Sequence, residues 1–160
     1  MAGAAPPAGH RTQEMRARNQ VALAMLLLAA ASLPLRARQE TVDELKTKLA
    51  SAKESEQPKL CLEIARLQLD ASEKAYQASQ TQQAQSLLQE VVNYSQKAGD
   101  AARQSRKHIK KTEIEVRKMS RRLQDLKPTV DLDSRQPVQD AINRLEHIRT
   151  QLLMEMFSER

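Results

Sequence analysis

The alternation of apolar and polar positions is most regular between residues 81 and 127. Apolar or small residues recur there at steps of four and three, and they form a seam along one helix face. The seam consists of Ala84, Leu88, Val91, Ser95, Ala98, Ala102, Ser105, Ile109, Thr112, Val116, Met119, Leu123 and Leu126. Heptad spacing of this kind holds one face of a helix against neighbouring helices over many turns. It predicts one long helix over about 81–127, roughly 70 Å long at about 1.5 Å per residue.

Gly99 is the weakest point of this predicted helix. A glycine costs about 1 kcal/mol relative to alanine inside a helix, and Asp100 could cap a new helix. The seam nevertheless continues from Ala98 to Ala102 without a slip, which favours a continuous helix. A break at Gly99 would instead give a compact up-and-down bundle from the same segments.

Three shorter helices are predicted around the long one. Residues 41–55 open with a Thr-x-x-Glu capping box. Residues 58–79 begin with a proline and are apolar around most of their first half, and residues 136–157 carry a broad apolar stripe. The second and third of these segments could lie antiparallel along the two halves of the long helix. We therefore expect an all-α antiparallel helical bundle or coiled coil, in agreement with 2% aromatic residues and only three glycines.

The N-terminal residues have the three parts of a secretory signal peptide. Within residues 15–37, a basic stretch precedes an apolar run of about fifteen residues, and small residues follow where cleavage could occur. The pattern predicts a cleavable signal peptide over 1–37, with Met15 as an alternative start, and a single helical-bundle domain over 38–160. The protein would then be exported to the periplasm or secreted. The alternative is a membrane anchor formed by residues 21–35, although a membrane span needs roughly 20 apolar residues.

Positive charge is concentrated in the second half of the predicted long helix. Residues 103–127 carry ten basic and three acidic side chains, a net charge of +7. Seven of the basic residues occupy positions outside the seam, and they are Arg103, Lys107, Lys110, Lys111, Arg117, Lys118 and Arg121. They would form a stripe suited to an acidic envelope polymer, an anionic lipid or an acidic protein face. The simpler explanation is an ordinary solvated face. The lack of interleaved aromatic residues disfavours nucleic acid.

Candidate catalytic and metal-binding residues are few. His108 and His147 could approach each other if the last helix folds back along the long one, but surface histidines are the simpler explanation. Cys61 is the single cysteine, so the chain can form no internal disulfide, and its apolar neighbours indicate burial. No nucleophile lies near a base in the pattern, and no carboxylate pair is held in a loop. The sequence therefore predicts a non-enzyme, and it identifies neither a cofactor nor an assigned metal site.

These observations favour an exported, non-enzymatic interaction or scaffold protein of a bacterial cell envelope. A protein partner or self-association is expected, because the Ala and Ser half of the seam buries little area on its own. One alternative is a binder of an anionic polymer or membrane surface through the basic face 103–122. Another is a small-ligand or metal-binding helical bundle.

Overall fold

The computed structural model describes residues 40–158, and this part of the chain contains helices and no strands. The predicted signal peptide over 1–37 and the alternative anchor over 21–35 lie outside the described residues. The helices are α2 (Val42–Ser51), α3 (Gln57–Gln77), α4 (Thr81–Ser105), α5 (Ile109–Leu126) and α6 (Leu132–Ser158), with a short 3-10 helix η1 (Lys127–Thr129) before α6.

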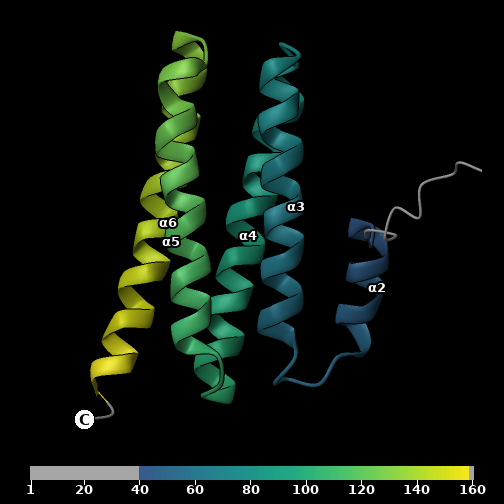
Figure 1. The fold of residues 1–160 in the computed structure, drawn as a ribbon, viewed down its shortest axis with the longest axis vertical. Coiled ribbons are helices and arrows are strands. Elements are labelled where there is room, and N and C mark those ends of the chain that lie inside the picture. The colour runs from purple at the N-terminus through teal and green to yellow at the C-terminus, as the bar shows by residue number, and fades with distance from the viewer. Residues whose placement is uncertain (1–39, 159–160) are drawn as a thin grey trace, which may run out of the picture. The chain divides into compact units, whose positions relative to one another are not determined.

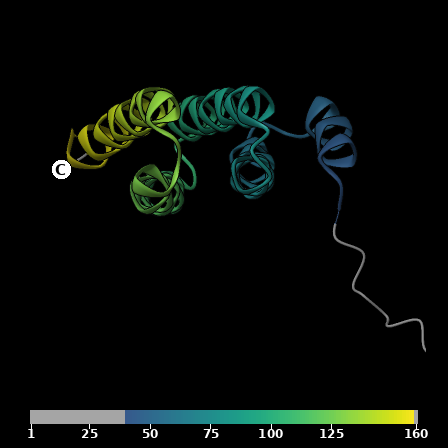
Figure 2. The same cartoon turned by 90° about the horizontal axis from the view of Figure 1, so that it is seen from above.

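The helices form two antiparallel hairpins that lie side by side. One hairpin consists of α3 and α4, and the other consists of α5 and α6 (Figure 1). Seen from above, α4 and α6 lie in one layer and α3 and α5 lie in the other (Figure 2). Successive helices from α3 to α6 run in opposite directions, so the two helices of each layer run in the same direction. The hairpins meet chiefly between α4 and α6, while α2 packs against α3. The predicted all-α antiparallel bundle is thereby confirmed.

The prediction of one long helix over 81–127 is wrong, because the chain reverses at residues 106–108. Arg106 and His108 take the left-handed conformation there, with φ angles of 52° and 64°. Neither residue is glycine or proline, so the sequence carried no ordinary signal for a break. The seam is buried on both sides of the break, with Ser105 and Leu126 half-buried. Both halves of the heptad pattern therefore predict buried positions correctly, and each half packs against different neighbouring helices.

Gly99 lies inside α4, so the helix continues through the position where a break was considered. The glycine has a packing role instead. A Cβ atom at this position would lie 3.1 Å from the Cγ2 atom of Ile148 in α6. That separation is tighter than an ordinary van der Waals contact, so the absent side chain allows α4 and α6 to approach closely.

The small residues of the seam are enclosed within one chain. Ala84, Ser95, Ala98 and Ala102 are all fully buried in α4. Small side chains let neighbouring helices approach closely, so they fill the space between helices without large apolar groups. Their burial is therefore complete without a second copy of the chain.

The helix predicted over 58–79 is found as α3 within two residues of its predicted ends, and the larger boundary differences are in the first and last helices. The first helix was expected over 41–55, but α2 ends at Ser51, after which the chain becomes extended. The last helix was expected over 136–157, but α6 begins at Leu132 and contains Pro137 in its second turn. A proline near a helix start removes only one backbone hydrogen bond close to the unpaired N-terminal donors, so the helix tolerates it. The predicted capping box at the start of α2 is present.

Two arginine side chains form ion pairs that connect the helices. Arg122 of α5 donates to Asp70 and Glu73 of α3, with nitrogen–oxygen distances of 2.7 and 2.6 Å. Arg149 of α6 donates to the buried carboxylate of Glu113 in α5 at 2.8 Å. The first set joins the two hairpins, and the second fixes the register of α5 against α6.

Candidate functional site

The break between α4 and α5 gathers exposed positive charge at one end of the bundle. Arg106, Lys107, Lys110 and Lys111 are all exposed, and none of them forms an ion pair within residues 40–158. We call these four residues, together with His108, the basic turn. Unpaired cations on a rigid support attract an anionic partner without first having to release an acidic neighbour.

Other members of the predicted basic stripe have acidic neighbours. Lys118 donates to Glu115 at 2.9 Å, and the side chain of Arg117 lies 3.8 Å from the Glu113 carboxylate. Arg103 of α4 pairs with Asp100. Arg121 is exposed and has no ion pair in the described part of the chain. The seven predicted residues therefore lie on two helices and on the turn between them. Four of them, Lys107, Lys110, Lys111 and Arg121, form no ion pair in the described part of the chain.

An apolar residue occupies the middle of the outward face of α5. Ile114 is half-buried, and helical spacing places Lys110, Lys111, Arg117 and Lys118 around it. Long basic side chains cover apolar surface with their methylene stems while their charged groups stay in water. The outward face of α5 thus continues the basic turn along the helix.

The backbone at the basic turn adopts conformations that favour glycine. A left-handed conformation costs an ordinary L-residue roughly 1–2 kcal/mol, whereas glycine adopts it readily. The chain has Arg106 and His108 at these two positions. The carbonyl oxygen of His108 accepts from the Thr112 backbone N–H at 2.8 Å, which starts α5. Strained residues of this kind cluster at functional sites, so the positions merit functional testing.

The two histidines considered for a metal site lie at different levels of the bundle. The Glu113–Arg149 pair shows which positions of the antiparallel helices α5 and α6 lie at the same level. His108 comes five residues before Glu113, so it lies level with about residue 154, five residues after Arg149. His147 lies roughly 10 Å from that level along α6, and its ring nitrogen is 2.9 Å from the Gln151 side chain. Within residues 40–158, no three His, Cys, Asp or Glu side chains group as metal ligands.

Cys61 is buried in α3, as its apolar neighbours indicated, with 2% of its surface exposed. Burial raises the pKa of the thiol to about 11, although the positive charge of Lys97 partly opposes this effect. The thiolate is the reactive form of cysteine, so this side chain is inert at neutral pH.

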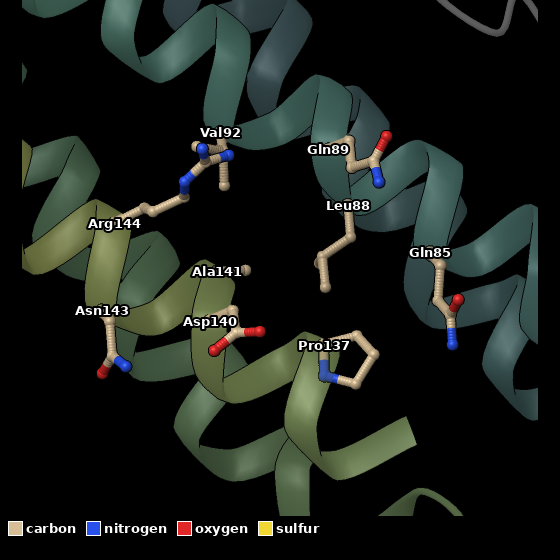
Figure 3. A pocket seen from close by; sticks show the side chains of 9 residues that line it. All are labelled: Gln85, Leu88, Gln89, Val92, Pro137, Asp140, Ala141, Asn143 and Arg144. Carbon is tan, nitrogen blue, oxygen red and sulfur yellow. The ribbon is translucent and has the colours of Figure 1, made fainter. Parts of the chain in front are cut away.

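A groove of about 570 Å³, lined by both polar and apolar side chains, lies between α4 and α6 (Figure 3). Its lining residues are Gln85, Leu88, Gln89, Val92, Pro137, Asp140, Ala141, Asn143 and Arg144. The Arg144 side chain extends from α6 toward Val92 of α4, and it forms no ion pair within the described residues. A second hollow of about 360 Å³ shares Val92, Asn143 and Arg144 with the first. The groove offers amide donors and acceptors, one carboxylate and one guanidinium group.

The last turns of α6 expose apolar side chains. Met154 and Phe157 are 66% and 61% exposed, whereas Met156 packs against the core. Leu132, at the other end of α6, is 75% exposed. Because α5 and α6 are antiparallel, Met154 and Phe157 lie at the same end of the bundle as the basic turn (Figure 1). Sequence reasoning missed this juxtaposition, since it follows from the break at 106–108.

Among the helices of residues 40–158, none is both long enough and apolar enough to span a membrane. No protein-family model matches the chain, and no curated protein or solved structure matches it significantly.

Proposed function

We propose that the protein is a non-catalytic interaction scaffold of a bacterial cell envelope, and that it binds an anionic partner through the basic turn. The observation that carries the binding proposal is the set of exposed cations at Arg106, Lys107, Lys110 and Lys111, unpaired within residues 40–158. Location in the envelope rests on the signal-peptide pattern of residues 15–37 alone.

The bundle supports this role by holding the charges in place. The turn is fixed on one side by α4, which is buried against α3 and α6, and on the other side by α5. A rigid surface loses little conformational entropy when it binds, so more of the electrostatic attraction contributes to affinity. The proposal assigns no catalytic residue.

A soluble polyanion tests the proposal directly. Heparin binding is measured over a salt series for the full chain and for a turn variant in which Lys107, Lys110 and Lys111 are replaced by Glu. Acidic residues near the N-terminus of a helix are favourable, so the new residues at the start of α5 should not unfold it. We expect the turn variant to bind at least tenfold more weakly, with the slope of log Kd against log salt concentration reduced by roughly two to three.

The matched control changes the same amount of charge elsewhere. In this control variant, Lys53, Lys59 and Lys74, which are exposed on α3 or just before it, are replaced by Glu. The control should retain most of its heparin affinity. Equal losses in the two variants would show that heparin responds only to overall charge, and the proposed site would be rejected.

Self-association is a separate proposal from the pattern of small seam residues. Those residues are enclosed within one chain, so they do not by themselves require a second copy. Light scattering of the purified protein at several concentrations gives its molar mass. A constant monomer mass would remove self-association as the basis of the scaffold role.

A further inference from the structure

Two features of opposite chemical character share one end of the bundle. The basic turn carries four exposed cations. Level with it, the last turns of α6 expose Met154 and Phe157, while Leu153 and Met156 beside them are half-buried. Both the α4–α5 turn and the C-terminal end of α6 lie at the lower end of the molecule in Figure 1. One flat surface could therefore contact both.

This combination distinguishes between kinds of anionic partner. A soluble polyanion would use the cations and leave Met154 and Phe157 in water. An anionic bilayer would use both, because head groups attract Lys and Arg while the boundary beneath them accepts methionine and phenylalanine side chains. Weak membrane signals of these two kinds are commonly needed together for stable attachment.

From this juxtaposition we infer that the anionic partner is the surface of a bilayer rich in anionic lipids. The protein docks end-on, with the basic turn against the head groups and with Met154 and Phe157 inserted beneath them. This inference rests on the proposed function, since it names the partner of the same basic turn.

The chain contains no tryptophan, which allows a local measurement. Phe157→Trp places a single fluorophore at the proposed contact, and Leu132→Trp places one at the exposed opposite end of the same helix. Each full-length variant is mixed with vesicles of phosphatidylcholine containing 0, 20 or 40% phosphatidylglycerol, with and without brominated phosphatidylcholine. The readout is specific to the labelled position, so binding through residues 1–39 does not replace it.

We expect the fluorescence of the Phe157→Trp protein to shift to the blue and to be quenched by brominated lipid as the phosphatidylglycerol content rises. The tryptophan at position 132 should be quenched about fivefold less or not at all. Replacing Lys107, Lys110 and Lys111 by Glu in the Phe157→Trp protein should abolish most of the quenching. Equal quenching at both positions, or no quenching at position 157, would overturn the inference.

Heparin binding separates this inference from the proposed function. Heparin binding that depends on the basic turn, together with an unquenched fluorophore at position 157, would leave the proposed function standing and reject the bilayer. The partner would then be a soluble polyanion or an acidic protein. Heparin binding that is insensitive to the basic turn would reject the proposed function itself.

Discussion

Replacing Gly99 with alanine tests the contact through which the two hairpins meet. The new methyl group would lie 3.1 Å from the Ile148 Cγ2 atom, so either α6 or the Ile148 side chain must move. Two opposing effects then determine the change in the free energy of unfolding. Alanine is about 1 kcal/mol better than glycine inside a helix, whereas overpacking a core typically costs about 1–3 kcal/mol.

The expected sum is a change between about zero and 2 kcal/mol of destabilisation. The balance should reverse when the neighbour is shortened. Ile148→Ala alone should destabilise the protein by roughly 2–5 kcal/mol, because Ile148 is almost completely buried. In that background the methyl group at position 99 meets no obstacle, so Gly99→Ala should stabilise by about 1 kcal/mol.

Urea unfolding followed by circular dichroism gives all four free energies of the cycle. Equal m-values across the variants would show that the unfolded and folded states remain comparable. The coupling energy between positions 99 and 148 should be about 1–3 kcal/mol. If Gly99→Ala stabilises both backgrounds by the same amount, α4 and α6 do not meet at this point and the arrangement of the hairpins is wrong.

Three further predictions concern single side chains. Burial raises the pKa of Cys61 to about 11. The thiol should therefore react with a thiol reagent at pH 8 only as fast as the protein unfolds, and rapid labelling of the folded state would contradict its burial. The hydrogen bond from Ser120 is the main cause of the lowered pKa of Glu146. A lowered pKa means that the ionised carboxylate stabilises the folded state, so this contribution to the free energy of unfolding should be lost as the pH falls below about 4.5. Ser120→Ala should raise the pKa of Glu146 in a carboxyl NMR titration. A Glu146 titration that Ser120→Ala does not shift would show that the hydrogen bond is absent. His108→Gly should stabilise the protein by about 1 kcal/mol by relieving the left-handed backbone, and a clear loss of stability would show that the turn is not strained.

The seam shows how far the sequence could predict the fold. Heptad spacing reports which side of a helix is buried, and that prediction holds on both sides of the break. The spacing does not report whether the helix continues, because residues 106–108 take the place of nearly one helical turn and preserve the register. The reversal uses Arg106 and His108 in conformations that usually belong to glycine, so residue type gave no signal.

The candidate site was partly accessible from the sequence. The outer positions of the basic residues follow from the seam. Three of their acidic partners lie at helical spacing, in the pairs Asp100–Arg103, Glu113–Arg117 and Glu115–Lys118. The groove near Arg144 could not be predicted, since it requires α6 to pack on α4 as well as on α5.

The reversal at residues 106–108 is tested most directly by one distance. Spin labels at Gln83 and Gln124, both exposed, are attached to double-cysteine variants in a Cys61→Ala background, and electron–electron resonance gives their separation. The antiparallel arrangement of α4 and α5 brings both labels to the same end of the bundle, so the distance should be about 30 Å or less. One uninterrupted helix would separate them by about 60 Å, and that result would contradict the two-hairpin fold and the basic turn with it.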